Sequence, residues 1–187
     1  LGMDVRFHCS IGDDPEGSSI SNMLSTEGIS TDQIIVVQSR KTLTKIRFYG
    51  SRESLLERSQ ILLQADRGPQ EPLSSDVSEA LATSALESLN DSCALVISDY
   101  DKGVIDAPGS HLLIRKAHKI GIPIIVDPKL TGLEKSRNAT TVLFEIRGLD
   151  LLRRRSMLDG PQETASHLIE SYGWDSLVVL GGVNGVT

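Results

Sequence analysis

The sequence has little of what marks several large classes of protein. Lysine and arginine number 19 against 25 aspartates and glutamates, so the net charge is −6, and Arg153 to Arg155 form the only basic run. Because nucleic-acid backbones are bound by clustered Lys and Arg, nucleic acid is not an expected partner. The two cysteines, Cys9 and Cys93, lie in apolar segments without the spacing of metal ligands. We therefore expect buried, reduced thiols and no disulfide.

Long apolar runs are also missing. No stretch approaches the roughly 18 apolar residues of a membrane span, and the first ten residues lack a basic segment followed by an apolar one. The four histidines are dispersed, which favours packing or surface roles over a metal site. We expect a cytoplasmic protein with no membrane partner. The 187 residues can form one domain with a buried core, and the first and last residues suggest that both ends are cut.

Helical patterns and apolar runs alternate through the second half of the chain. Helices are predicted at 76–90, 107–120 and 161–172, and buried strands at 93–98, 122–128 and 176–180. Asp76 and Glu79 form a predicted capping box, while Gly121 and Gly173 predict left-handed helix ends. Continuous apolar strands separated by helices are typical of a parallel sheet with right-handed crossovers. The predicted fold class is therefore α/β.

The first part of the chain has a different pattern. A strand at 4–12 precedes a helix that Asp14 and Pro15 open, with Ile20, Met23 and Leu24 predicted to face inward. Two strands at 34–38 and 42–50 follow, which we interpret as a hairpin. Residues 51–72 mix charges with leucines and then turn to Gly, Pro and Gln, which predicts an extension and a linker. We interpret 34–72 as a small β-lid with its extension and linker.

Aspartate and lysine follow two neighbouring strands of the predicted sheet. SDYDKG at 98–103 supplies Asp99, Asp101 and Lys102, and IPIIVDPK at 122–129 supplies Asp127 and Lys129. Because ligands of open α/β sheets bind outside the carboxyl ends of the strands, these side chains are expected to converge on one site. The lysines could hold a phosphate. The carboxylates could hold Mg²⁺, a sugar hydroxyl or only the lysines, and they could also merely cap the turns.

These two motifs resemble those of the ribokinase-type (PfkB) carbohydrate kinases, and closely those of the heptose-7-phosphate kinase branch. That branch has S-D-Y-x-K-G at one strand end and V/I-D-P-K at the next. Weaker similarities lie in IGDDPEG at 11–17, RKTLTKIRFY at 40–49 and GGVNG at 181–185. The resemblance implies a ribokinase-like three-layer αβα domain with a mostly parallel sheet and a β-lid, of which residues 1–187 are an incomplete, partial kinase domain.

The resemblance also implies an activity. Such an enzyme transfers the γ-phosphoryl group of ATP, with Mg²⁺, to the anomeric hydroxyl of D-glycero-D-manno-heptose 7-phosphate, giving the 1,7-bisphosphate used for nucleotide-activated heptose and lipopolysaccharide. The substrate-binding residues that it implies are Asp99, Lys102, Lys129, Thr44, Lys45 and Arg47. The implied nucleotide-binding residues are Asp127, Glu145, Gly148, Gly182 and Gly185.

The chain departs from the family pattern in ways that bear on catalysis. The catalytic base of the family is the Asp of a G-A-G-D motif, which we expect to lie beyond Thr187, so no catalytic residue is assigned within the chain. The G-G-x-x-N-V-A helix that contacts sugar in the family is also absent from the 187 residues. The N-x-x-E motif that organises Mg²⁺ and ATP aligns with Glu145 and Gly148, and Asp150 is the one candidate metal ligand nearby.

Two hypotheses follow from these departures. The first is a sugar kinase segment, and we expect the isolated chain to be inactive because the base is missing. The alternative is a non-catalytic kinase-like module that binds sugar phosphate or forms a homodimer through the β-lid. The exact sugar phosphate and a fused adenylyltransferase domain stay open.

Overall fold

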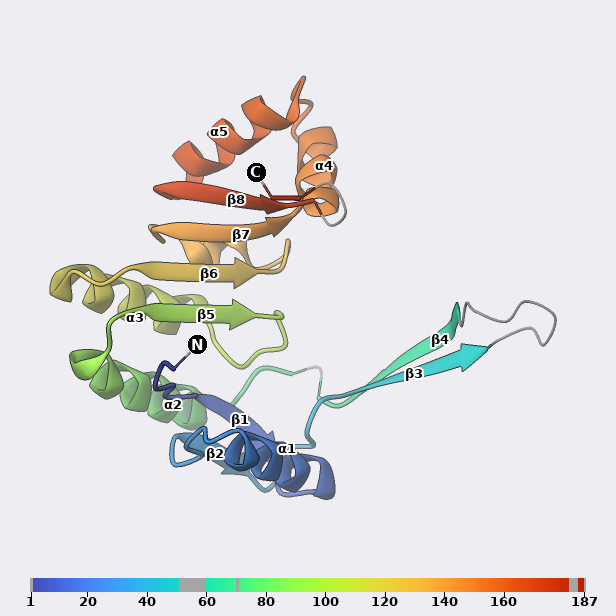
Figure 1. Cartoon of the computed structure of the whole chain (residues 1–187), viewed down its shortest axis with the longest axis vertical. Helices are drawn as coiled ribbons and strands as arrows, with labels where there is room; N and C mark the ends of the chain where they lie inside the picture. The colour runs from blue at the N-terminus through green and yellow to red at the C-terminus, as the bar shows by residue number, and fades with distance from the viewer. Residues whose placement is uncertain (1, 51–59, 70, 182–184, 187) are drawn as a thin grey trace. The chain divides into compact units, whose positions relative to one another are not determined.

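A computed structural model describes residues 2–50, 60–69, 71–181 and 185–186. The chain divides into two compact units, residues 1–72 and residues 73–187 (Figure 1). None of the described helices is long and apolar enough to cross a membrane.

The first unit contains two pairs of strands. Its elements are β1 (Cys9–Gly12), α1 (Pro15–Thr26), β2 (Ile34–Val37), β3 (Thr44–Gly50) and β4 (Gln60–Arg67). β1 and β2 pair in parallel, with Cys9 opposite Ile34, and α1 is the crossover between them. β3 and β4 form an antiparallel hairpin that starts with Thr44 opposite Arg67. Its register shifts between Phe48 and Tyr49.

The predicted hairpin of 34–38 with 42–50 is wrong. β2 pairs with β1, and the partner of β3 is β4, which lies in the segment that the sequence pattern assigned to a lid extension and linker. Ile34–Val37 is a continuous apolar run, which is typical of a parallel strand and gives no two-residue alternation. The hairpin in the segment predicted to be a lid therefore consists of β3 and β4, and residues 51–59 of the predicted extension lie outside the described residues.

Two further expectations for the first unit are corrected. The first strand covers only Cys9–Gly12 of the predicted 4–12. Met23 of α1 was expected to face inward, but 65% of it is exposed. The position of Met23 three residues after Ile20 suggested an apolar stripe, but only one buried residue, Gly17, lies in this helix.

The two cysteines are free thiols, as expected, but their predicted burial is only partly correct. Cys9 on β1 is half-buried, and burial raises the pKa of its thiol. Cys93 is exposed, because it lies two residues before β5, the strand that its apolar neighbours form from Leu95 onward. The apolar run around Cys93 therefore did not indicate the burial of this side chain.

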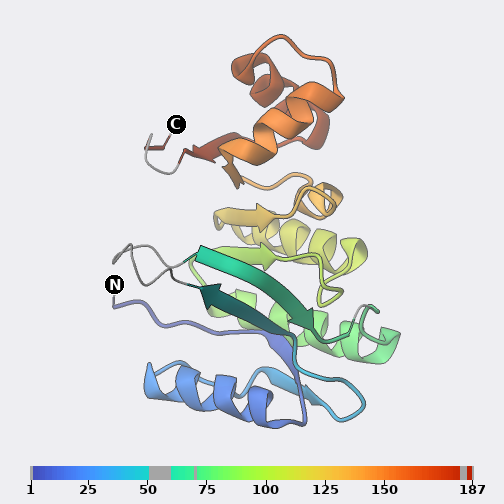
Figure 2. The same ribbon diagram turned by 90° about the vertical axis from the view of Figure 1, so that its right-hand side faces the viewer.

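The second unit is an α/β structure built on a four-stranded parallel sheet in the order β5-β6-β7-β8. Figure 2 shows these strands stacked in chain order, with α3 beside them. The elements are α2 (Ser75–Ser88), η1 (Leu89–Asp91), β5 (Leu95–Asp99), α3 (Ala107–Ile120), β6 (Ile124–Pro128), η2 (Leu133–Ser136), β7 (Thr141–Glu145), α4 (Ile146–Arg155), α5 (Pro161–Tyr172) and β8 (Ser176–Leu180).

The helix and strand pattern of the second unit is largely as predicted. α3 and α5 end at Gly121 and Gly173, both left-handed, with φ of 74° and 68°. The predicted capping box is wrong, because the N-cap of α2 is Ser74, two residues before Asp76, and Asp76 lies in the first turn of the helix. β7 was not among the predicted strands. It lies between β6 and β8 and so completes the sheet.

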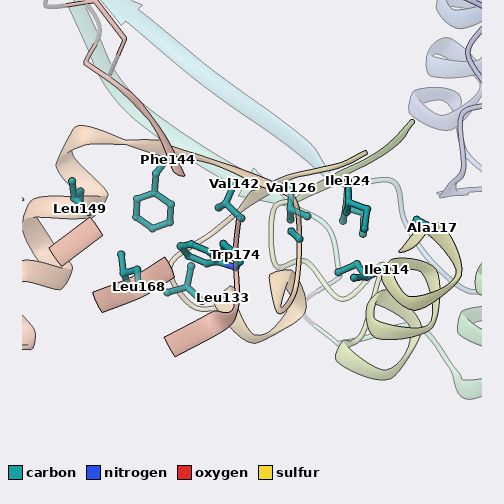
Figure 3. Close-up of a cluster of buried hydrophobic side chains, with 12 residues drawn as sticks. Ile114, Ala117, Ile124, Val126, Leu133, Val142, Phe144, Leu149, Leu168 and Trp174 are labelled. Carbon is teal, nitrogen blue, oxygen red and sulfur yellow. The ribbon is translucent and has the colours of Figure 1, made fainter. Parts of the chain in front are cut away.

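The core of the second unit lies against one face of the sheet. Figure 3 shows side chains of β6 and β7 meeting those of the helices on a single side of the strands. The fully or nearly fully buried members are Ile97, Ile114, Ala117, Ile124, Val126, Leu133, Ala139, Val142, Phe144, Leu149, Leu168 and Trp174. Trp174 also stacks on Tyr172, with ring centroids 5.1 Å apart. Its indole Nε1 donates a hydrogen bond of 2.9 Å to the carbonyl oxygen of Ser136.

The segment that follows β6 is held through its main chain. Carbonyl oxygens of four residues in it accept hydrogen bonds from side chains elsewhere in the unit. The donors and acceptors are Ser110 Oγ to Lys135, His111 Nε2 to Glu134, His118 Nε2 to Asn138 and Trp174 Nε1 to Ser136. A carbonyl can only accept, so both histidines donate through Nε2. Two of the dispersed histidines therefore have structural roles.

Candidate functional site

The carboxyl ends of the four parallel strands meet at one edge of the sheet (Figure 1). Asp99 ends β5, and Lys129 follows directly after Pro128, the last residue of β6. The backbone N–H of Lys129 donates a hydrogen bond of 3.1 Å to the carbonyl oxygen of Asp99, which joins the two strand ends. The structure thus brings together the two motifs that sequence analysis singled out.

The carboxylate of Asp99 points into the protein. Asp99 is only 3% exposed, and its Oδ1 accepts a hydrogen bond of 2.9 Å from the backbone N–H of Asp101. Its Oδ2 lies 2.9 Å from Nζ of Lys135, off the direction of a regular hydrogen bond, so that this contact is an ion pair. The predicted contact of Asp99 with substrate stays a prediction, and the carboxylate is already engaged within the protein.

Lys135 is the residue of this edge that sequence analysis missed. It lies 34 residues after Asp101, and its Nζ is 2.8 Å from Asp101 Oδ1. Burial lowers the pKa of Lys135, but the hydrogen bond to Asp101 and the charges of Asp99 and Asp101 outweigh that effect and raise the pKa overall. The pKa of Asp101 is lowered, first by the hydrogen bond from Lys135 and then by one from Thr131. Lys135 therefore stays charged and pairs with both carboxylates.

The turn after β5 has a special backbone. Asp101 has φ of 52° and Gly103 has φ of 72°, so both are left-handed. Aspartate tolerates this conformation better than most residues, and its hydrogen bond to Asp99 supports it. Lys102 lies between the two and is half-buried. Its charge contributes to the lowered pKa of Asp101, which places the Lys102 side chain near this carboxylate.

Lys129 and Tyr100 lie on the outer side of the same edge. Nζ of Lys129 lies over the ring of Tyr100, 4.6 Å from its centroid, and both side chains are exposed. Such a cation–π contact is worth about 0.5–1 kcal/mol at an exposed site, so it orients the ammonium group without burying it. We call Asp99, Asp101, Lys102, Lys129 and Lys135 the strand-end cluster.

Gly132 is required by the close approach of its backbone to Asp99. A Cβ on Gly132 would lie 2.8 Å from Asp99 Oδ2, and Asp99 cannot withdraw without leaving Lys135. We expect Gly132→Ala to lower the free energy of unfolding by about 1–3 kcal/mol, the range for overpacked sites, in urea denaturation.

Gly160→Ala is the control for Gly132→Ala. No atom lies within 4 Å of a Cβ at Gly160, and its φ of −149° suits alanine, so the loss should stay below about 1 kcal/mol. Equal stability of the two variants would show that the carboxylate of Asp99 moves freely.

The residues predicted for the nucleotide are distributed along the same edge. Asp127 is half-buried on β6 and lies opposite Ser98 of β5. Glu145 ends β7 and precedes α4 without a capping hydrogen bond from its side chain. Gly148 packs on the ring of Phe144, where a Cβ would come within 3.0 Å, so that packing alone explains the glycine.

The glycine loop after β8 is partly described. Gly185 is left-handed, with φ of 86°, and its carbonyl oxygen accepts a hydrogen bond of 2.8 Å from the N–H of Gly181. Gly182 lies outside the described residues. The nucleotide-binding role of this loop therefore stays a prediction.

The catalytic base is the part of the predicted site that the structure does not reach. The family resemblance implies that this Asp lies beyond Thr187, and Thr187 itself lies outside the described residues. The last described residue, Val186, forms an isolated antiparallel bridge with Leu180 of β8. The position of the base relative to the strand-end cluster therefore stays a prediction.

Asp150, the candidate metal ligand, is held by two arginines. Arg153 Nη2 lies 2.9 Å from its Oδ1, and Arg154 Nη2 lies 2.8 Å from its Oδ2. The hydrogen bond from Arg153 is the main cause of its lowered pKa. Across the described residues there is no group of three or more His, Cys, Asp or Glu that could hold a metal ion. The residues present thus do not form a fitting Mg²⁺ site by themselves.

In the first unit, Asp14 organises the turn that resembles G-D-D-x-x-G. Its Oδ1 accepts hydrogen bonds from the N–H of Gly17 at 2.8 Å and the hydroxyl of Thr42 at 2.7 Å. Its Oδ2 accepts one of 2.8 Å from the N–H of Thr42. The two bonds from Thr42, followed by that from Gly17, lower the pKa of Asp14. This aspartate caps α1 and ties it to the segment before β3, which is a structural role.

The predicted lid residues occupy both faces of β3. Alternation along the strand places Thr44 on one face, and Lys45 and Arg47 on the other. The hydroxyl of Thr44 donates a hydrogen bond of 3.3 Å to the carbonyl oxygen of Thr42, and Arg47 Nε donates one of 3.2 Å to Gln64 of β4. Lys45 is exposed. These three residues therefore do not form a single binding surface on the strand.

Comparison with curated proteins finds relatives of one kind. The chain is 30% identical over 189 residues to the bifunctional protein HldE of Paramagnetospirillum magneticum, an alignment that covers 100% of the chain and 37% of that protein. The HldE of Rhodospirillum rubrum is 34% identical over 143 residues, covering 76% of the chain and 27% of that protein. The aligned residues thus make up 37% of the length of the first relative and 27% of the second. No family model matches the chain.

Solved structures show the same fold. Fructokinase from Xylella fastidiosa with bound ATP aligns with a TM-score of 0.67 and 17% identity over 100% of the chain and 58% of that protein. The PfkB protein from Polaromonas sp. JS666 gives a TM-score of 0.68 with 15% identity over 100% and 63%. The ribokinase-like α/β fold predicted from the sequence is confirmed. The chain has the ribokinase-like fold of these sugar kinases and is similar, over its whole length, to part of the bifunctional protein HldE.

Proposed function

We propose that this chain is part of a sugar kinase whose substrate is D-glycero-D-manno-heptose 7-phosphate and whose phosphoryl donor is ATP. In the reaction, the bond between the γ-phosphorus of ATP and its bridging oxygen breaks, and a bond from the anomeric oxygen of the sugar to that phosphorus forms. The products are ADP and heptose 1,7-bisphosphate. The proton of the anomeric hydroxyl passes to a base, a role that the family resemblance gives to the Asp of G-A-G-D, expected beyond Thr187.

The observation that carries the proposal is the strand-end cluster. Lys102 and Lys129 come from two neighbouring strand ends that a backbone hydrogen bond joins. Ligands of open α/β sheets bind at this edge, and phosphate binds well to ammonium groups held beside it. The choice of a sugar phosphate follows from the resemblance of these two motifs to those of the heptose-7-phosphate kinase branch. The lid residues Lys45 and Arg47 are proposed as further contacts of the anionic substrate.

ATP is proposed as the donor because the fold neighbours include a fructokinase with bound ATP. Asp127 on β6, Glu145 at the end of β7 and Gly185 after β8 are the proposed nucleotide contacts. Mg²⁺ would neutralise the phosphates of ATP when it binds. Because Asp150 is paired with arginines, we propose that the nucleotide phosphates provide most of the metal's ligands.

We expect the 187-residue chain to bind heptose 7-phosphate without phosphorylating it. Binding measured by calorimetry should be at least roughly tenfold weaker for heptose without the phosphate, because one charge-assisted hydrogen bond is worth about 1.5–3 kcal/mol. An assay of ADP release with MgATP should show no turnover, because the 187 residues contain no Gly-Ala-Gly-Asp sequence.

Fructose 6-phosphate is the matched control ligand, since it keeps the phosphate and changes the sugar. Equal binding of the two sugar phosphates would reduce the proposal to a general sugar-phosphate site. No binding of heptose 7-phosphate would overturn it. Measurable turnover by the purified chain would overturn the expected inactivity and leave the substrate assignment intact.

A second candidate function is a non-catalytic module that forms a homodimer through the lid. It is favoured by the apolar residues that the β3–β4 hairpin exposes, since five of them are each more than half exposed: Phe48, Tyr49, Ile61, Leu62 and Leu63. Exposed apolar side chains on an edge hairpin are typical of a surface that pairs with another chain. A dimer that binds no heptose 7-phosphate in the calorimetry above would favour this candidate.

A further inference from the structure

The charges of the strand-end cluster are nearly balanced, and Lys135 decides the balance. The cluster contains two carboxylates, Asp99 and Asp101, and the ammonium groups of three lysines, which leaves one net positive charge. Without Lys135 the cluster would be neutral. An anionic ligand is attracted by the net field of the groups around it, so that Lys102 and Lys129 alone do not determine the attraction.

Lys135 lies too deep to touch a ligand. Its side chain is 13% exposed, and Nζ is already within 2.9 Å of both Asp99 and Asp101. If its charge were removed, Asp99 would remain as a carboxylate that is 3% exposed and has no cation beside it. A buried charge without a partner is strongly unfavourable, so the aspartate would turn outward or take up a proton.

The position of Lys102 depends on the same contacts. The backbone N–H of Asp101 donates to Asp99 Oδ1, and the carboxylate of Asp101 accepts from Lys135. These two bonds hold Asp101 in its left-handed conformation, with φ of 52°. Because Lys102 is the next residue, the direction of its side chain follows from the turn. A loose Asp101 would spread Lys102 over many directions.

The backbone around Lys135 is itself fixed. The hydroxyl of Ser110 donates a hydrogen bond to the carbonyl oxygen of Lys135. The hydroxyl of Ser136 donates a hydrogen bond of 2.6 Å to the carbonyl oxygen of Leu133. Indole Nε1 of Trp174 donates to the carbonyl oxygen of Ser136. Ser110 and Ser136 are both fully buried. The main chain that carries Lys135 is therefore held in place by hydrogen bonds, which fixes where its side chain meets the two aspartates.

We infer that Lys135 is a positioning residue for the phosphate of the sugar substrate: it cancels the charge of Asp99 and Asp101 and fixes the turn that directs Lys102. The inference rests on the proposed function for the identity of the ligand. It adds a residue that the sequence motifs do not include, and it gives Asp99 and Asp101 a role other than contact with substrate.

The test uses three variants of the 187-residue chain: Lys135→Met, Asp101→Asn and the double variant. Calorimetry with heptose 7-phosphate should show roughly tenfold weaker binding for Lys135→Met and severalfold tighter binding for Asp101→Asn. The double variant restores one net positive charge but not the bond between Lys135 and Asp101, so it should recover part of the affinity that Lys135→Met loses. A purely structural role of Lys135 would not be rescued by removing a second charged group.

A second measurement needs no ligand. Hydrogen exchange of the Asp101 amide, followed by NMR, should be roughly tenfold faster in Lys135→Met, because the turn opens more often. Lys135→Arg keeps the charge and should leave both affinity and exchange close to the wild type.

The outcomes separate the inference from the proposed function. If the wild type fails to bind heptose 7-phosphate, the proposed function fails, and faster exchange at Asp101 still supports the positioning role. If Lys135→Met binds within twofold of the wild type, or its Asp101 amide exchanges at the wild-type rate, the inference is overturned. If Lys135→Met does not fold, Asp101→Asn decides: affinity no tighter than the wild type overturns the charge balance.

Discussion

Replacing Lys102 and Lys129 together by alanine is expected to weaken binding of heptose 7-phosphate by roughly a hundredfold or more. Each lysine can make a charge-assisted hydrogen bond to phosphate worth about 1.5–3 kcal/mol, which is roughly ten- to a hundredfold in affinity. Removing both also changes the strand-end cluster from net positive to net negative. The measurement is calorimetry at fixed ionic strength, because phosphate binding to lysine is screened by salt.

The matched control is the double replacement of Lys116 and Lys119 by alanine. It removes the same two charges from α3, away from the strand ends. It should change the affinity by less than roughly threefold, as expected for the long-range field alone. If the control weakens binding as much as the test variant, the effect comes from the net charge of the chain, and the two lysines do not form the site.

Trp174→Ala is expected to lower the free energy of unfolding by about 3–5 kcal/mol, the usual cost of deleting a buried aromatic side chain. Trp174 is 3% exposed and stacks on Tyr172. Its loss also leaves the carbonyl oxygen of Ser136 without the indole donor. Because Trp174 is the only tryptophan, unfolding must be followed by circular dichroism in urea rather than by tryptophan fluorescence.

Met157→Ala is the control for this variant. Met157 is 89% exposed and should contribute little, so the change in stability should stay within about 0.5 kcal/mol. A loss below about 1 kcal/mol for Trp174→Ala would contradict the packing described for the second unit. Trp174→Phe should recover part of the loss, because it keeps the ring and lacks only the hydrogen bond and some volume.

The sequence predicted those features that depend on residues close together in the chain, such as the starts and ends of helices. Gly121 and Gly173 mark helix ends because a left-handed residue is needed there, and Pro161 marks a helix start, so α3 and α5 were predicted within a residue. The strand ends at Asp99 and Lys129 could also be placed side by side, because parallel strands separated by one helix meet at the same edge.

The remaining errors concern partners distant in the sequence. β2 could pair with β1 or with β3 by its composition, and only the parallel register with Cys9–Gly12 decides between them. Lys135 had no local signal, because its two partners, Asp99 and Asp101, lie on another strand end. The carboxylates therefore looked available to a ligand, while the folded chain supplies their cation itself.

The segment around Lys135 is anchored through its carbonyl oxygens, and this determines how it can evolve. Hydrogen bonds from Ser110, His111, His118 and Trp174 specify where the main chain of this segment lies without specifying its side chains. The exposed Glu134, whose carboxylate pairs with Arg137, can thus be exchanged while the frame is retained, whereas Thr131 hydrogen-bonds to Asp101 and belongs with the strand-end cluster. A library of variants at these two positions would separate changes that alter the cluster from changes that leave it intact, because most members should still fold.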